Sequence, residues 1–355
     1  MPTDFHKLSR LVTSREVTPQ DAQLIARAFD EQNLRSGDQL WQQDDSAPTM
    51  GLLHRGQLSV RVNGEEIGTI LAGDVLGETA ALWANAKRSA TIVAVEPSVV
   101  LLLPSLELQR LAQAFPSFHE RLLDRCLDAQ AKRIRATDVR IAKLSQGILP
   151  APSANADSGL AKLWKRVRQA VGDGSRPALL PLLRDQPVLR DQGEQIIQAI
   201  ADAFEPYAFD KGEIIAREGE AGDAVWLLAV GEVQALRHVR NRMAELLVSF
   251  QPGWLFGAVT LAVSGPRTAT CVAASSGWVY RMDRAAYEAL ADRPRLAWKE
   301  CMVATMGIQL RNANAMLAGF QSGEHPGGPL PELQLQQLLR AAGVLLGGAG
   351  EPLTG

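Results

Sequence analysis

The sequence predicts an α+β fold, mainly β, in which two tandem jelly-roll β-barrels are each flanked by helices. The chain has 355 residues, which exceeds one ordinary core and suits two units of about 150 residues each. Short apolar alternations separated by glycine recur in both halves, and short strands with regular turn signals are typical of jelly rolls. The two halves also repeat one another, which fixes the number of barrels at two.

The repeat is visible when Gly37 is aligned with Gly212, because the same offset then aligns Gly56 with Gly231. Beyond the second glycine the downstream copy is longer before the matching segments GDVLG and GWLFG. Loops absorb insertions and strands do not. The extra residues therefore predict a longer hairpin loop in the second copy.

The elements follow in the order helix, barrel, long helix, twice. Apolar residues recur at helical spacing in TPQDAQLIARAFDEQ, before the first barrel, and in LELQRLAQAF and the following segment after it. The segment from Ser145 to Gly159 is rich in Ser, Pro, Ala and Gly, a composition typical of linkers. The predicted divisions are a first domain over residues 1–144, a linker and connecting helix over 145–175, a second domain over 176–320, and a Gly/Pro linker with a short apolar tail over 321–355.

The long helix over residues 118–144 carries an apolar seam at alternating spacings of three and four. The seam consists of Leu123, Leu127, Gln130, Ile134, Thr137, Ile141 and Leu144. Such a seam suits a partner helix. Two interpretations remain open: a homodimer through this helix, or packing of the helix against the second domain of the same chain.

Composition narrows the function classes. With 37 basic and 39 acidic residues, the chain lacks the basic surplus of a typical nucleic-acid binder. No window of about 18 apolar residues predicts a membrane span, and no signal peptide is seen. The three cysteines, Cys126, Cys271 and Cys301, lack metal-ligand spacing, and no catalytic motif occurs. We expect a cytoplasmic, non-enzymatic protein without a metal site, a nucleic-acid partner or a membrane anchor.

The segment from Gly77 to Thr91, the first cassette, combines residue types suited to a sugar phosphate. Glu78 can accept hydrogen bonds from sugar hydroxyls, Arg88 can pair with a phosphate, and Gly77 permits a close backbone approach. A second cassette runs from Gly257 to Thr270 and keeps the arginine, but it has Ala258 in place of the glutamate. One site is predicted to be complete and the other degenerate.

These cassettes resemble those of the cyclic nucleotide-binding domain family, found in bacterial catabolite-activator-type regulators and, in tandem, in the regulatory subunit of cAMP-dependent protein kinase. The resemblance implies that Glu78 holds the ribose 2′-hydroxyl and Arg88 the cyclic phosphate. It implies that Ser89 and backbone N–H groups near Glu78 and Thr79 hold the remaining phosphate oxygens. It also implies that the long helix contacts the base, through Arg133 or, one turn later, Thr137.

In the second cassette Gly257, Arg267 and Thr268 match the family pattern, whereas Ala258 cannot accept the ribose hydrogen bonds. An unpaired buried hydroxyl costs about 1–3 kcal/mol, or roughly ten- to hundredfold in affinity. Three states of this second site therefore remain open: weak binding, a different ligand, or none.

The resemblance implies a sensor that relays binding of a cyclic nucleotide to a protein effector. cAMP is the default ligand and cGMP remains open. A scaffold whose cassettes no longer bind nucleotide is the alternative function. A DNA-binding regulator is a third class, but no helix-turn-helix can be placed beside either barrel.

Overall fold

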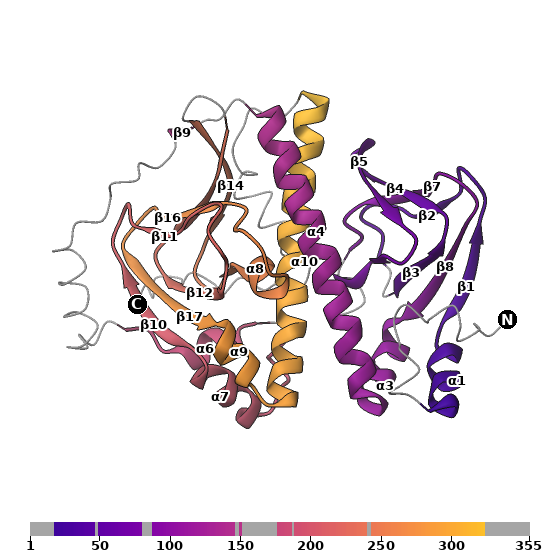
Figure 1. Ribbon diagram of the computed structural model, residues 1–355, viewed down its shortest axis with the longest axis horizontal. Helices are drawn as coiled ribbons and strands as arrows, with labels where there is room; N and C mark the ends of the chain where they lie inside the picture. The colour runs from indigo at the N-terminus through magenta and orange to yellow at the C-terminus, as the bar shows by residue number, and fades with distance from the viewer. Residues whose placement is uncertain are drawn as a thin grey trace, which may run out of the picture.

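A computed structural model describes residues 18–46, 49–79, 87–145, 149–150, 176–186, 188–239 and 243–323. It shows two units of antiparallel sheets with helices between and around them (Figure 1). The predicted connecting helix and apolar tail lie outside the described residues. The domain divisions themselves stay a prediction.

The first unit contains two four-stranded antiparallel sheets, ordered β1-β8-β3-β6 and β2-β7-β4-β5. Its strands are β1 (Asp30–Leu34), β2 (Gln39–Trp41), β3 (Thr49–Arg55), β4 (Gln57–Val62), β5 (Glu65–Leu71), β6 (Val75–Leu76), β7 (Thr91–Ala94) and β8 (Ser98–Pro104). Along β4 the buried and more exposed residues alternate in part, as expected for a sheet with one face on a core. The predicted mainly β character is confirmed for this unit.

The second unit repeats this order. Its sheets run β10-β17-β12-β15 and β11-β16-β13-β14, and the second sheet gains β9 at its edge. Its strands are β10 (Glu205–Phe209), β11 (Ile214–Ala216), β12 (Ala224–Val230), β13 (Val233–His238), β14 (Met243–Phe250), β15 (Leu255–Phe256), β16 (Thr270–Ala273) and β17 (Gly277–Asp283), and β9 (Leu149–Pro150) comes from the segment predicted as linker.

The internal repeat is confirmed by matching hydrogen bonds. The amide of Gly37 donates to the carbonyl of Ala94 at 2.8 Å, and the amide of Gly212 donates to the carbonyl of Ala273 at 2.8 Å. The longer hairpin is confirmed as well. β4 and β5 are joined by Asn63 and Gly64 alone, whereas β13 ends at His238 and β14 begins at Met243.

Helices flank both units. They are α1 (Pro19–Arg27), α3 (Ser105–Ala114) and α4 (Pro116–Leu144) in the first half, and α6 (Leu179–Arg184), α7 (Glu194–Asp202), α8 (Ala258–Ala262), α9 (Arg284–Ala289) and α10 (Asp292–Ser322) in the second. Thr18 caps the N-terminus of α1, because its hydroxyl accepts a hydrogen bond from the Asp21 amide at 3.2 Å. Pro19 follows at the first helical position, where its missing N–H costs nothing.

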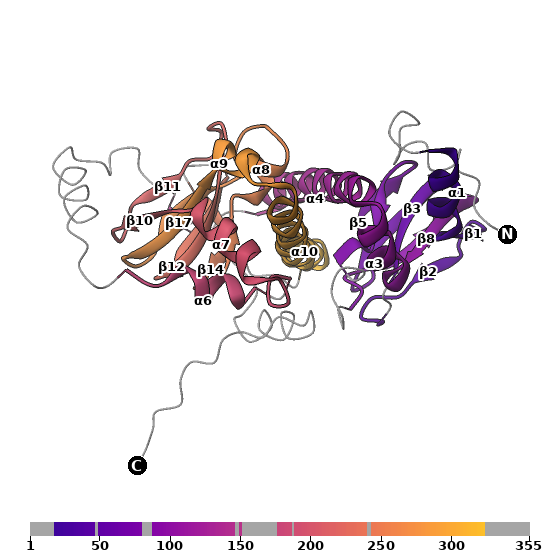
Figure 2. The ribbon, with the colours of Figure 1, turned by 90° about the horizontal axis from the view of Figure 1, so that it is seen from below.

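The two long helices, α4 and α10, lie side by side between the sheets of the two units (Figures 1 and 2). They run parallel, because His119 bonds Glu300 at 2.6 Å near one end and the Thr137 hydroxyl donates to Asn314 at 3.3 Å farther along both helices. Six of the seven predicted seam residues of α4 are buried, and Leu144 is exposed. The structure therefore supports the intramolecular interpretation of the seam, since α10 of the second domain covers it.

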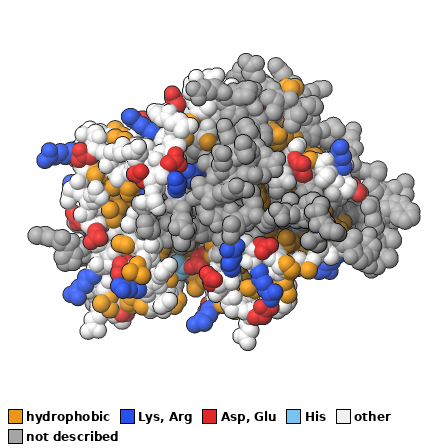
Figure 3. Space-filling model, turned by 180° about the vertical axis from the view of Figure 1, so that it is seen from behind, with side chains coloured by type: hydrophobic (Ala, Val, Ile, Leu, Met, Phe, Trp, Pro, Cys, Tyr) orange, Lys and Arg blue, Asp and Glu red, His pale blue; other side chains and the backbone are white. Residues whose placement is uncertain are grey.

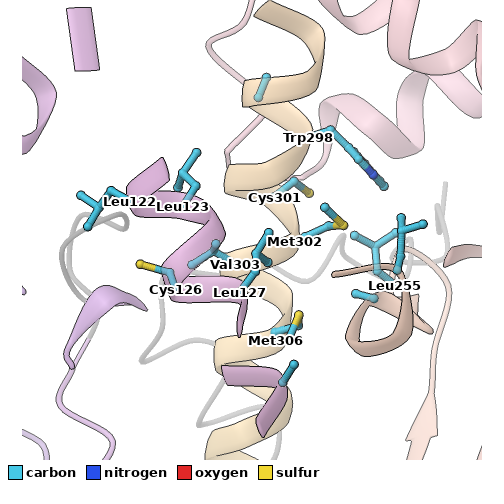
Figure 4. Close-up of a cluster of buried hydrophobic side chains, with 14 of the residues drawn as sticks. Leu122, Leu123, Cys126, Leu127, Leu255, Trp298, Cys301, Met302, Val303 and Met306 are labelled. Carbon is cyan, nitrogen blue, oxygen red and sulfur yellow. The ribbon is translucent and has the colours of Figure 1, made fainter. Parts of the chain in front are cut away.

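The contact between α4 and α10 belongs to one hydrophobic core shared by the two halves. Leu123 and Leu127 of α4 point toward α10, and Met302 and Met306 of α10 are fully buried beside them (Figure 4). The ring of Trp298 is also fully buried and meets Phe204 edge-on, with ring centroids 5.3 Å apart. The two units are thus joined by a packed apolar interface as well as by the chain.

Candidate functional site

The first cassette begins where β6 ends. Gly77 has φ of 72°, a left-handed conformation that favours glycine. A Cβ atom at this position would overlap the Arg88 guanidinium and lie 2.8 Å from the Trp41 ring. The glycine is therefore required both by the backbone turn and by the close approach of Arg88.

Arg88 is the most constrained charge in this site. It is 3% exposed and its guanidinium carbon lies 3.5 Å from the centre of the Trp41 ring. Nη1 donates to the Thr49 carbonyl at 2.8 Å and Nη2 to the Thr49 hydroxyl at 2.6 Å. Burial lowers the pKa of Arg88 to about 10, against the opposing charges of Glu78 and Asp45.

The Arg88 Nε is buried and has no hydrogen-bond partner among the described residues. Buried polar groups are usually paired, and a buried cation is stabilised by an anion. Together with the cavity at this position, the unpaired Nε marks Arg88 as a group that an anionic ligand can satisfy.

Glu78 lies beside this cavity and is 4% exposed. Its Oε1 is 3.6 Å from Nη1 of Arg133 on α4. Arg133 also donates to the carbonyl of Val75. The guanidinium of Arg133 thus holds the carboxylate in the cavity wall, and its predicted contact with a base stays a prediction.

The first cavity is lined by residues of both domains. Gly77, Glu78, Thr79, Arg88, Ser89 and Arg133 come from the first domain, and Gly307, Ile308, Leu310, Arg311 and Asn314 come from α10. Thr137 is not among the lining residues, and its hydroxyl bonds Asn314 instead. The structure thus places Asn314 at the cavity wall, behind which Thr137 lies.

Helix α10 reaches the first cassette at two positions. A Cβ atom at Gly307 would overlap the side chain of Thr79, so the glycine lets the helix lie against the cassette. One turn later, Arg311 Nη2 donates to Asp44 Oδ1 at 2.9 Å and Nη1 donates to the Lys87 carbonyl at 3.4 Å. Sequence reasoning missed these residues, although a glycine and an arginine one turn apart in a long helix were a usable signal.

The second cassette keeps the turn and the arginine. Gly257 has φ of 83°, and Arg267 is 8% exposed with its guanidinium carbon 4.3 Å from the centre of the Trp226 ring. Arg267 Nη1 donates to the Thr260 hydroxyl at 3.2 Å, and Nη2 lies 3.7 Å from Asp223. Burial lowers the pKa of Arg267, against the opposing charge of Asp223.

The second site has lost a charge pair. Where the first site has Glu78 and Arg133, the second has Ala258, which is fully buried, and Gln309. Gln309 Nε2 donates to the Leu255 carbonyl at 3.0 Å, as Arg133 donates to that of Val75. The carboxylate and its cationic partner have both been replaced by neutral side chains.

The second cavity is lined by the second cassette and by Ile134, Asp138 and Ile141 of α4. Asp138 is 4% exposed and lines this cavity together with Thr268. Burial raises the pKa of Asp138 to about 7, with Glu218 raising it further and the Thr268 hydrogen bond and the charge of Arg237 opposing the shift.

Substituting Asp138 with Asn should flatten the pH dependence of stability. The carboxyl has an ordinary pKa of 3.8 and a folded pKa of about 7, so the folded state binds more protons between these values. Its stabilising contribution is present below about pH 3.8 and is lost as the pH rises through about 7. We expect the unfolding free energy of the wild type, measured by urea denaturation, to fall relative to that of Asp138→Asn between pH 5 and pH 8. The fall should be at most about 1.4 kcal/mol per pH unit. If the unfolding free energies of the two proteins changed with pH in the same way, the raised pKa of the buried Asp138 carboxyl would be contradicted.

A family model described as "Cyclic nucleotide-binding domain" matches residues 31–115 and 207–293. The chain is also 30% identical over 154 residues to the "CRP-like cAMP-activated global transcriptional regulator" of Mycobacterium tuberculosis, a match covering 43% of this chain and 67% of that protein. The chain belongs to the cyclic nucleotide-binding domain family. Each of the two matched segments contains one of the two cassettes. The predicted tandem arrangement is therefore confirmed.

Tandem members of the family cover more of the chain. The "cAMP-dependent protein kinase regulatory subunit" of Yarrowia lipolytica is 23% identical over 249 residues, which is 70% of this chain and 50% of that protein. This chain thus spans about half the length of that relative. Among solved structures, the cAMP-bound regulatory domain of Toxoplasma gondii PKA is 18% identical, covers 82% of this chain and 93% of that one, and has a TM-score of 0.30.

Within the described part of this family member, no helix is long and apolar enough to cross a membrane. The same residues contain no group of three or more His, Cys, Asp or Glu side chains placed to hold a metal ion. On the face shown in Figure 3, basic and acidic side chains are intermixed where residues are described. No concentration of one charge sign is visible on that coloured area.

Proposed function

We propose that this chain is a non-enzymatic, cytoplasmic sensor that binds a cyclic nucleotide, cAMP by default, in its first domain. The observation that carries the proposal is the buried Arg88 guanidinium, whose Nε has no partner among the described residues, beside the buried carboxylate of Glu78. Arg88 would pair with the cyclic phosphate and Glu78 would accept the ribose 2′-hydroxyl. The family membership and the names of its relatives support a regulatory role.

The remaining parts of the proposal rest on smaller observations. Each pair of facing antiparallel sheets is inferred to be a jelly roll, because both units share one strand order. Cys126, Cys271 and Cys301 are free thiols and buried, which supports a reducing compartment. The effector is inferred to be a protein.

Binding in the first domain would be passed on through α4 and α10. Both helices line the first cavity, α4 through Arg133 and α10 through Arg311 and Asn314. A ligand shifts such an arrangement only by its different affinity for the two positions of the helices. The signal to an effector would therefore be a change in how α4 and α10 lie against the first cassette.

Titration calorimetry with cAMP and, in parallel, cGMP tests this proposal. We expect one site per chain for wild type and for Arg267→Ala, and a roughly ten- to hundredfold loss of affinity in Glu78→Ala because the ribose hydroxyl loses its acceptor. Arg267→Ala is the control in the second cassette, since it removes the buried arginine that corresponds to Arg88. Two sites would show that Ala258 is tolerated, and absence of binding by either nucleotide would favour the scaffold function.

A further inference from the structure

Helices α4 and α10 each reach across to the cassette of the other domain. Arg135 of α4 donates to the Val263 carbonyl of the second cassette at 2.9 Å, and Arg311 of α10 contacts the Lys87 carbonyl just before Arg88 in the first. One turn farther along, Asp138 lines the second cavity and Asn314 lines the first. The two arginines, and likewise Asp138 and Asn314, occupy equivalent positions on the two helices.

One of the two equivalent pairs differs in charge: both helices supply an arginine, but α4 supplies the Asp138 carboxyl where α10 supplies the neutral Asn314 amide. At the complete first cassette α10 supplies a guanidinium and a neutral amide, and Ser89 is exposed and makes no hydrogen bond with described residues. At the second cassette α4 supplies a guanidinium and a carboxyl, and Thr268, which corresponds to Ser89, lines the same cavity as that carboxyl. Among the described residues, the hydroxyl that would face a phosphate has no partner in the first cassette, whereas in the second it lines the cavity together with a buried acid.

Another feature of the second cavity also opposes a nucleotide. Ala258 supplies no acceptor for a ribose. In its ionised form the buried Asp138 carboxylate would repel a phosphate placed on the Thr268 hydroxyl, because charges interact strongly away from water. Helix α4 instead supplies polar groups to this cassette, through Asp138 and Arg135.

We propose that the second cassette binds helix α4 of the first domain, through Asp138 and Arg135, in place of an anionic nucleotide. The second domain then responds to the position of α4 rather than to a ligand of its own. Nucleotide binding in the first domain, where α4 also carries the Arg133 that holds Glu78, would reach the second cassette through this one helix. This consequence rests on the proposed function, whereas the helix-for-ligand exchange does not.

The first test uses the full chain without nucleotide and measures amide hydrogen exchange. Asp138→Ala should raise exchange in residues 257–270 by roughly tenfold, since a buried polar contact of α4 with the cassette is lost, and leave the first cassette unchanged. Asp128→Ala is the matched control, because Asp128 lies on the same helix and, among the described residues, pairs with the exposed Lys132. Equal exchange in the two variants would overturn the proposal.

The second test introduces into the second cassette the side chains that the first cassette has and the second lacks. It then counts binding sites by titration with cAMP. Ala258→Glu with Gln309→Arg rebuilds the pair seen at Glu78 and Arg133, yet we expect it to leave one site per chain. Adding Asp138→Ala, or Asp138→Asn, should give a second, weaker site, whereas adding Asp128→Ala should not. A second site in the variant that keeps Asp138 would overturn the proposal.

The two tests separate the possible failures. Heat from the first site reports that each variant is folded. If wild type gives no heat with either nucleotide, the proposed function fails, while the exchange experiment still decides whether α4 is held by the second cassette.

Discussion

Substituting Arg88 with Ala is expected to lower cyclic nucleotide affinity on the order of 100- to 1000-fold, since charge-assisted hydrogen bonds to a phosphate are the strongest contacts the site can offer. Arg88 holds its position through both Thr49 contacts and the Trp41 ring, so it is aligned before the ligand arrives. Equilibrium dialysis with labelled cAMP measures the loss directly.

Two further variants give the Arg88 result its meaning. Arg88→Lys keeps the charge but not the planar fork, and should retain only part of the affinity. Arg110→Ala removes an exposed arginine paired with Glu107 and should bind as wild type does. If Arg88→Ala binds within a few-fold of wild type, Arg88 is a structural ion that stabilises the cassette, and the scaffold function gains support.

Substituting Trp298 with Ala should cost about 3–5 kcal/mol of unfolding free energy, the range for truncating a buried aromatic side chain. The ring is fully buried in the core shared by α4, α10 and the second domain, and it contacts Phe204 edge-on. Urea denaturation followed by circular dichroism measures the change. Because the core is shared, exchange protection of α4 should fall together with that of α10.

The control for Trp298 is Leu106→Ala on α3, where the leucine is 58% exposed. A surface substitution of this kind should change the unfolding free energy by about 0.5 kcal/mol or less. If Trp298→Ala destabilised α10 while α4 kept its full protection, the two halves would be independent domains and the relay through α4 would lose its basis.

Much of the fold could be predicted because its signals are local. The paired glycines at 37 and 212 fix turns, and their hydrogen bonds recur in both units. The longer hairpin between β13 and β14 could be predicted because the second copy of the repeat has extra residues there. The cassette could also be predicted, since Gly77, Glu78 and Arg88 are close in sequence and their side-chain chemistry suits one ligand.

The contribution of α10 to the first site could not be predicted, because it depends on a contact between residues far apart in the chain. Gly307 and Arg311 meet the first cassette only after α10 has packed beside α4. The apolar seam of α4 was equally compatible with a second chain, since periodicity shows that a partner exists and not which helix it is. The pairing of Asp138 with Thr268 had no local signal at all.

The parallel pair of α4 and α10 joins two similar halves in one molecule, where a symmetric dimer would join two identical chains. In a symmetric dimer any substitution appears in both copies at once, so losing a carboxylate in one site would lose it in the other. Within a single chain, Glu78 and Ala258 can differ, as can Asn314 and Asp138. The covalent link also makes the pairing of the halves intramolecular, so it should not weaken on dilution. One half is thereby free to specialise while the other keeps its original chemistry.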